Sequence, residues 1–404
     1  MSDLFFLPSW PPQLGSIPWY ALLLLAAAIA GELVHRWLHL PRLLGWIAAG
    51  LALGPQVSGL IDAKALAGMR GVLDVAIGVV LFQLGQRVDF GWLRRNPWLL
   101  ATSVLESALA FAGVFVVLLL LDVRPLLAAL AAAIGIATGP AVVLSLVREL
   151  RAQGQVTERM LLLTSLNCVY AFVAVSMLLA WLHQAYSDQE WLAIVAHPLY
   201  LIFGSLLLAL AFAWVTLGLL ALLGRREDAQ FISVIALVVA AVYAASMLNL
   251  SIALVLLGYG VMARAFDSRR RFASLSFGRL GQILLILLFA ITAATLDLDL
   301  LPAGAFAGAA LVAARYAGKA LGVLAIAPLS GLSVRKASLL SLGLMPMSGV
   351  ALILVHDTTA LFPGLGPQLS SVVVSAIVML ELLGPAAAYF ALARAGEADE
   401  PGRG

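Results

Sequence analysis

Four ionisable side chains stand inside apolar stretches of this sequence that are long enough to cross a lipid bilayer. They are Glu106, Arg315, Lys319 and Glu381. A charge in the hydrocarbon core is costly, so such residues usually serve a solute or proton path or pair with one another. Arg315 and Lys319 are four residues apart and share one face of a helix. Glu106 and Glu381 are predicted to be the counter-charges of these two bases. Their role is either proton coupling or a structural salt bridge that holds helices together.

Two of the apolar stretches are interrupted near their middle, at Thr138-Gly139-Pro140 and at Pro346-Met347-Ser348-Gly349. Proline removes a backbone donor and leaves an upstream carbonyl without its helical partner. Free carbonyls at membrane depth are tolerated where they line a cavity or are packed in protein. A simple kink in the helix would explain one such interruption. Two interruptions at matching positions favour a binding site between two broken, crossing helices.

The composition indicates a membrane protein. Of 404 residues, 63% are hydrophobic and 11% are charged, whereas a soluble domain carries about 25% charged residues. A soluble globular protein and a disordered chain are both excluded. The apolar runs are continuous rather than alternating, which predicts an all-α integral membrane protein and not a barrel. We expect about thirteen transmembrane helices of about 20 residues each, near 18–37, 41–59, 70–88, 97–121, 125–148, 155–183, 198–223, 230–247, 249–264, 278–299, 303–328, 334–358 and 367–394.

The order of these spans predicts an internal repeat. The breaks fall in the fifth and twelfth spans, so each lies at the centre of a triplet, at about 97–183 and about 303–394. The triplets are an odd number of spans apart, which makes one an inverted copy of the other. We expect both to form a transporter core and the helices at about 18–88 and 230–299 to form a scaffold. The whole of 1–404 is then a single membrane domain without a soluble regulatory domain.

The charges predict an orientation. With the N-terminus outside, most of the 24 basic residues fall in segments on the cytoplasmic side, as the positive-inside rule requires of a multi-pass protein of the cell (inner) membrane. The C-terminus is then cytoplasmic. The net charge of +3 reflects this topology, and we expect the lipid bilayer, not nucleic acid, as the partner. No residues have the spacing of a metal site, a catalytic triad or a phosphate-binding loop, which predicts a non-enzyme without metal or cofactor.

Asn167-Cys168 lies in the middle of the sixth span, close to the first break. An amide in hydrocarbon needs hydrogen-bonding partners, so Asn167 is expected to bond to neighbouring helices or to ligate an ion or water. Cys168 is expected to pack as a small hydrophobic residue. We include both with Thr138, Gly139 and Pro140 in the predicted ion or substrate site, together with Met347 and Ser348 of the second break.

Several motifs occur in an order and spacing that belong together: Leu40-Pro41-Arg42-Leu43-Leu44-Gly45 with Gly50 and Gly54-Pro55, then Leu81-Phe82-Gln83-Leu84-Gly85, Ala137-Thr138-Gly139-Pro140-Ala141-Val142-Val143, and Phe289 to Leu298. Over almost its whole length the chain resembles the monovalent cation:proton antiporter superfamily, especially the bacterial branch that includes glutathione-gated potassium efflux proteins. The resemblance implies a sodium/proton-antiporter-like fold, a homodimer, and exchange of a monovalent cation for protons by alternating access.

The chain also departs from the family that it resembles. The antiporters carry an Asp-Asp or Asn-Asp pair in the sixth span, where this chain has Asn167-Cys168. A thiol is a poor ligand for sodium or potassium, which are hard cations and prefer oxygen. We therefore expect the exchanging acid to be relocated. Glu381 is favoured because the inverted repeat places it opposite Asn167-Cys168, and Glu106 is the second choice. Either Arg315 or Lys319 would hold the empty carboxylate.

Two other functions stay open on these residues. The first is a transporter of an organic or anionic solute, in which Arg315, Lys319 and the N-termini of the half-helices bind negative charge. The second is a membrane scaffold or sensor that transports nothing. Thermal stabilisation by anions would favour the first, and a stable fold without any response to substrates would favour the second.

Overall fold

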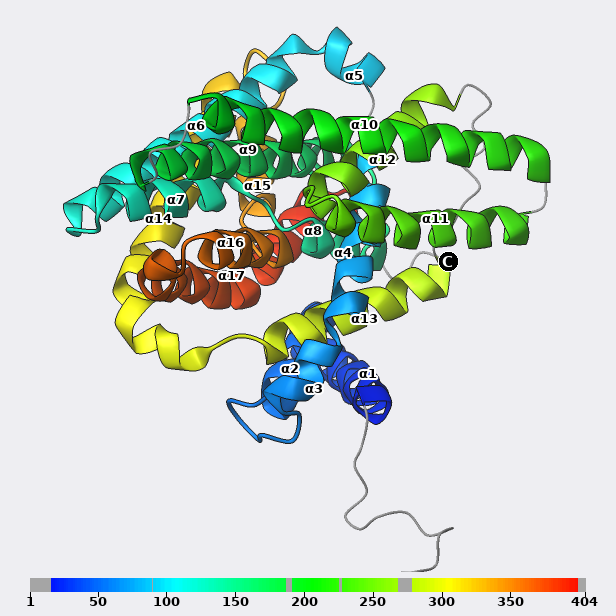
Figure 1. The fold of residues 1–404 in the computed structure, drawn as a ribbon, viewed down its shortest axis with the longest axis horizontal. Coiled ribbons are helices and arrows are strands. Elements are labelled where there is room, and N and C mark those ends of the chain that lie inside the picture. The colour runs from blue at the N-terminus through cyan, green and yellow to red at the C-terminus, as the bar shows by residue number, and fades with distance from the viewer. Residues whose placement is uncertain (1–15, 89, 187–190, 225–226, 268–277, 399–404) are drawn as a thin grey trace, which may run out of the picture. The chain divides into compact units, whose positions relative to one another are not determined.

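The computed structural model describes residues 16–88, 90–186, 191–224, 227–267 and 278–398, and every element within those ranges is a helix (Figure 1). The predicted all-α fold is thereby confirmed. The chain divides into two compact units. The first is formed up to Leu73 and by Ile286–Leu296, and the second by Asp74–Leu285 together with the chain from Asp297 onward.

The helices of the first unit are held by close backbone contact. They are α1 (Ser16–Leu33), the π-helix η1 (Val34–Leu38), α2 (Arg42–Leu53), α3 (Ala63–Gly68) and the last part of α13 (Gly278–Ala294). A Cβ atom at Gly45 would collide with the carbonyl of Ala30, and one at Gly50 with the carbonyl of Ala290. Small residues let membrane helices approach in this way. The rings of Trp46 and Phe289 complete the contact at 6.1 Å between centroids.

The second unit contains the remaining helices, which include those that the sequence assigns to the core, at about 97–183 and 303–394, and several that it assigns to the scaffold. They are α4 (Arg70–Gly85), α5 (Phe90–Arg95), α6 (Pro97–Leu120), α7 (Pro125–Ile136), α8 (Pro140–Glu149), α9 (Gln155–Tyr186), α10 (Trp191–Leu223), α11 (Glu227–Met247), α12 (Ile252–Phe266), the 3-10 helix η3 (Leu298–Leu300), α14 (Leu301–Ile326), α15 (Val334–Gly343), α16 (Gly349–Leu361), the 3-10 helix η4 (Pro363–Leu365) and α17 (Gly366–Arg394). Their close mutual packing brings α6, α7, α14 and α17 around one centre.

Many of these helices can cross a membrane. By length and composition, eight do so within the described residues: Pro18–Leu38, Pro97–Leu120, Pro125–Glu149, Gln155–Leu182, Leu199–Leu223, Asp228–Met247, Leu298–Ile326 and Pro363–Arg394. The other expected spans, at about 41–59, 70–88, 249–264, 278–299 and 334–358, contain shorter or divided helices. The chain is thus a multi-pass membrane protein, while the number of thirteen crossings stays a prediction.

Both predicted helix breaks are present. Residues 137–139 separate α7 from α8, and residues 344–348 separate α15 from α16. Pro140 occupies the first turn of α8, where a missing N–H costs nothing because that donor has no helical partner. Each divided pair is flanked in the chain by two long helices, α6 and α9 or α14 and α17. This repeat of helix order is the one that the sequence predicts.

The contact between α6 and α14 is made by glycines. A Cβ atom at Gly318 would collide with Ala110, and one at Gly322 with the backbone of Glu106. Glycine therefore lets the two helix backbones touch. The face of α14 that carries Gly318 and Gly322 also carries Lys319, so the same contact directs a long basic side chain toward α6.

The chain beyond α17 returns to the start of α9. The carboxylate of Glu397 accepts hydrogen bonds from Val156 N and Thr157 N, both at 2.9 Å, and from Thr157 Oγ1 at 3.0 Å. Lys336 Nζ lies 3.6 Å from the same carboxylate, and Gln153 N donates to the Glu397 carbonyl at 2.8 Å. A carboxylate at these first amides satisfies free donors and complements the helix dipole. The C-terminal segment therefore ties α17, α9 and α15 together.

We expect Glu397→Ala to lower the free energy of unfolding by about 1–2 kcal/mol, because the first amides of α9 lose their acceptor. The measurement is the melting temperature of the purified protein in detergent. Glu32→Ala is the control, because the Glu32 side chain is half-exposed and pairs with the surface residues Arg36 and Arg42. Equal melting temperatures for the two variants would show that the carboxylate at α9 contributes nothing.

Candidate functional site

The site is built where the two helix breaks cross. The non-helical segments 137–139 and 344–348 meet through a backbone hydrogen bond from Gly139 N to the Pro346 carbonyl at 2.9 Å. A Cβ atom at Gly139 would lie 2.8 Å from Ser348 Oγ and 3.3 Å from Ser348 N, so the two chains leave little room for a side chain at this position. Pro140, Met347 and Ser348 are all buried here. The structure thus brings together the predicted residues of both breaks.

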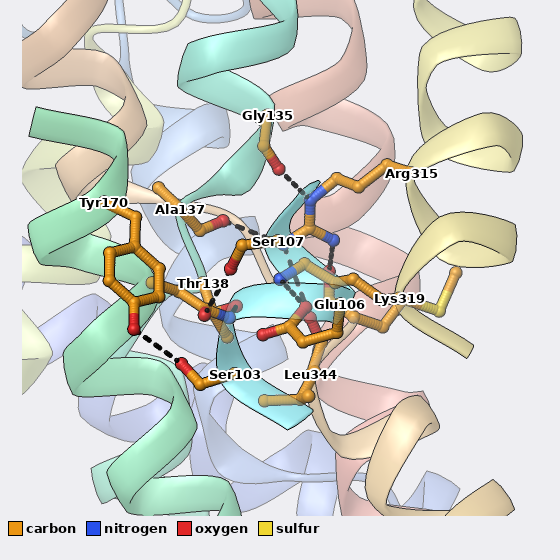
Figure 2. A network of polar contacts seen from close by, with 12 residues as sticks. Ser103, Glu106, Ser107, Gly135, Ala137, Thr138, Tyr170, Arg315, Lys319 and Leu344 are labelled. Atoms are coloured by element: carbon orange, nitrogen blue, oxygen red, sulfur yellow. Dashed lines mark hydrogen bonds and ion pairs between the residues drawn. The ribbon is translucent and has the colours of Figure 1, made fainter. Parts of the chain in front are cut away.

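Arg315 fills the centre of this crossing. Its side chain is completely buried and donates to the carbonyls of Gly135 at 2.7 Å, Ala137 at 2.8 Å and Met345 at 2.8 Å. Two longer bonds reach Leu344 O at 3.3 Å and Pro346 O at 3.4 Å. These carbonyls belong to the C-terminal ends of α7 and α15, where free acceptors concentrate partial negative charge. Arg315 therefore neutralises both helix ends and holds the breaks together (Figure 2).

Lys319 lies one turn further along α14 and forms the buried ion pair of the site. Its Nζ is 2.9 Å from Glu106 Oε2, with both side chains at most 1% exposed. The other carboxylate oxygen, Glu106 Oε1, has no hydrogen-bond partner among the described residues. The predicted pairing of an embedded base with an embedded acid therefore occurs between α14 and α6. A buried pair is stable only while both partners are present.

A cluster of oxygen atoms lies beside this pair, between α6, α9 and the first break. Asn167 Nδ2 donates to Thr138 Oγ1 at 3.1 Å, and Asn167 Oδ1 accepts from Ser107 Oγ at 3.0 Å. Cys168 Sγ lies 3.5 Å from the Thr138 carbonyl and is buried. Figure 2 shows Thr138 and Ser107 next to Glu106. The amide of Asn167 thus joins α9 to α6 and to the break, one of the two roles that the sequence left open.

Sequence reasoning overlooked three polar residues of the same region. Ser103 Oγ donates to Tyr170 OH at 3.3 Å, and Ser107 holds Asn167 as described above. Ser103 lies three residues before Glu106 and four before Ser107, so it is a neighbour of both on the surface of α6, and all three are buried. That spacing was a usable signal. The choice of Tyr170 on α9 as the partner of Ser103 has no sequence signal, because it depends on how α6 and α9 pack.

Glu381 differs from the other embedded charges. Its side chain is 1% exposed, and neither carboxylate oxygen has a hydrogen-bond partner among the described residues. It lies on α17 one turn before Gly384, where a Cβ atom would come within 2.8 Å of Pro346 Cα. The sequence predicts counter-charges in both Glu106 and Glu381. In the structure Lys319 pairs with Glu106, and Arg315 donates to backbone carbonyls. Neither base therefore pairs with Glu381.

The comparisons with known proteins agree with this architecture. A family model described as sodium/hydrogen exchanger, transmembrane, matches residues 21–391. A structure of the sodium proton antiporter MjNhaP1 from Methanocaldococcus jannaschii at pH 8 is similar with a TM-score of 0.72 and 16% identity, covering 95% of this chain and 98% of that one. An electron microscopy map of MjNhaP1 gives a TM-score of 0.70 at 14% identity, with 94% and 96% covered.

At these identities the structural likeness shows a shared fold. No curated protein sequence matches the chain. The family model, in contrast, spans nearly all the helices described above, including both breaks and the residues of the buried ion pair. This chain belongs to the sodium/hydrogen exchanger family of membrane antiporters.

Proposed function

We propose that this protein exchanges a monovalent cation for protons by alternating access, and that Glu106 is the carboxylate for which the cation and Lys319 compete. The observation that carries the proposal is the buried ion pair of Glu106 and Lys319 at 2.9 Å, beside the crossing of the two broken helices. The sequence favoured Glu381 for this role. The geometry favours Glu106, because Glu106 pairs with Lys319 whereas Glu381 has no hydrogen-bond partner among the described residues.

The pair supplies a mechanism for exchange. A cation that enters and binds the carboxylate of Glu106 takes the place of the Lys319 ammonium. A buried ammonium without a counter-charge is costly, so Lys319 then gives up its proton to water. When the cation leaves on the other side, Lys319 takes up a proton and closes the pair again. One cation and one proton exchange at this site, and its total charge stays constant.

The surroundings of Glu106 suit a hard cation. Sodium and potassium prefer oxygen ligands. The hydroxyls of Ser107 and Thr138, which Figure 2 shows next to Glu106, are hydrogen-bonded to the amide of Asn167 and together with its amide oxygen supply such ligands. We propose these oxygens as ligands that complete the coordination once Asn167 and its partners rearrange. Cys168 keeps a structural role at the Thr138 carbonyl.

The geometry gives no support to an anionic substrate. Arg315 directs its donors at five backbone carbonyls, and Lys319 is paired with Glu106. Anion binding at the crossing would have to break one of these arrangements, which leaves buried acceptors or a buried carboxylate unpaired. A cation requires only the exchange of one positive charge for another.

The proposal includes the core, the scaffold, the dimer and the membrane orientation that the sequence predicts. The triplets at about 97–183 and 303–394 form the moving core, and the helices at about 18–88 and 230–299 form the scaffold of a homodimer. The protein lies in the cell (inner) membrane with its N-terminus outside. The motif resemblance supports placement in the branch with the potassium efflux proteins, and the missing sixth-span carboxylate supports a divergent ion site.

The experiment that tests the function measures proton flux in proteoliposomes. An imposed pH gradient is challenged with sodium, potassium and lithium in turn, and the collapse of the gradient is followed with a pH-sensitive dye. We expect at least one of these cations to collapse the gradient. If protein shown to be folded responds to none of them, exchange is refuted and the scaffold role becomes the better explanation.

A further inference from the structure

We propose that Glu381 is a second proton-binding site, separate from the pair of Glu106 and Lys319, and that it adds one proton to each transport cycle. The proton binding is argued from the structure of α17 and its neighbours. Only the last step, the addition of a proton to the exchange, rests on the proposed function.

The first argument is the isolation of the Glu381 carboxyl group. It lies within a membrane-spanning helix, is 1% exposed, and neither oxygen has a hydrogen-bond partner among the described residues. An isolated carboxylate in such surroundings costs far more than a neutral carboxylic acid. Glu381 therefore carries its proton in this conformation, and it can release it only in a conformation that supplies water or a counter-charge.

The second argument is that no basic side chain among the described residues forms a hydrogen bond with Glu381. Helix α17 packs against α7, α8, α14, α15, α16, η3 and η4. On α14, Arg315 is occupied by carbonyls and Lys319 by Glu106. The other titratable side chains of these elements and of α17 itself are Arg148, Glu149, Asp299, Tyr316, Arg335, Lys336, His356, Asp357, Tyr389 and Arg394. None of them forms a hydrogen bond with Glu381.

The third argument is position. Glu381 lies one helical turn from Gly384, which touches Pro346 in the second break. Next to this contact, the hydroxyl of Ser348 is buried and has no partner among the described residues. Any shift of the second break along α17 changes what faces Glu381. The carboxyl group is therefore placed where the conformational change of a transporter with broken helices would expose it.

A second proton changes the electrical character of the exchange. The pair of Glu106 and Lys319 exchanges one proton for one monovalent cation, so no net charge crosses the membrane. If Glu381 also takes up a proton on one side and releases it on the other, two protons cross for each cation and one net charge is moved. The exchange then responds to the membrane potential.

Proton binding is tested by infrared spectroscopy of the purified protein over a pH series, with no need for transport. We expect wild type to show the carbonyl band of a protonated carboxylic acid that shifts in deuterium oxide and disappears at high pH. Glu381→Gln should lose this band, and the matched variant Glu106→Gln should keep it. If Glu381→Gln yields no folded protein, Glu381→Asp should keep the band at a shifted frequency. A band that stays unchanged in Glu381→Gln, or a wild-type band that never titrates, overturns the proposal.

The transport step is tested by the reversal potential of proteoliposomes, in which the proton-to-cation ratio is read from the voltage that stops net flux. We expect two protons per cation for wild type and one for Glu381→Gln, with flux retained. An equal ratio in the two proteins refutes the second transported proton. If no cation drives proton flux in wild type but the infrared band titrates, the proposed function fails and Glu381 still binds a proton.

Discussion

Glu106→Gln is expected to abolish cation-dependent proton flux. The amide that replaces the carboxylate carries no charge, so an entering cation finds no counter-charge and does not displace Lys319. The variant also leaves the Lys319 ammonium buried without its partner, and breaking a buried pair in this way costs about 3–5 kcal/mol. Proton flux and melting temperature should therefore both fall, with flux reduced to the level of empty liposomes.

The double variant Glu106→Leu with Lys319→Met separates these two effects. Replacing both members of a buried pair by well-packed hydrophobic side chains of similar volume is often neutral or stabilising. The double variant should therefore regain the melting temperature of wild type and still fail to transport. Flux that returns together with stability would show that the pair is structural and that the exchanging acid lies elsewhere.

Cys168→Ala is the matched control for the identity of the acid. By the motif resemblance, Cys168 stands where the antiporters carry a carboxylate, and its thiol donates a hydrogen bond to the Thr138 carbonyl. We expect Cys168→Ala to keep cation-dependent flux within about twofold of wild type, because removing one weak thiol bond costs little. Loss of flux in Cys168→Ala with full flux in Glu106→Gln would reverse the assignment.

Arg315→Met is expected to have the largest effect on stability. The side chain is completely buried, and its guanidinium is the donor for carbonyls of both broken helices. Each buried polar group left without a partner costs about 1–3 kcal/mol, so the loss of several at once is comparable to the whole stability of a typical protein. We expect little folded protein in detergent, as measured by size-exclusion chromatography after expression.

Arg315→Lys and Arg335→Met show whether this effect depends on the guanidinium geometry. A lysine keeps the charge but offers one compact ammonium instead of a planar fork of donors, so it should recover only part of the folded yield. Arg335 is exposed and donates to the Arg394 carbonyl at 3.3 Å, so Arg335→Met should express like wild type. A normal yield of Arg315→Met would refute the role of Arg315 in holding the breaks together.

The sequence by itself determined the class of the protein and the places where its helices break. Long apolar runs have one stable form in a bilayer, because a helix satisfies all its backbone groups internally. Pro140 and Pro346 mark the breaks because proline acts locally, through its missing N–H and fixed backbone. The four embedded charges were equally visible, because any charge within an apolar run is exceptional.

The tertiary structure alone decided how those charges are used. Arg315 and Lys319 lie on one helix face, and no sequence pattern assigns carbonyls to the first and Glu106 to the second. That division follows from Gly318 and Gly322, which bring α14 into backbone contact with α6, and from the crossing of the breaks around Arg315. Glu381 is unpaired for the same reason, since electrostatic partners are chosen by three-dimensional distance and not by separation along the chain.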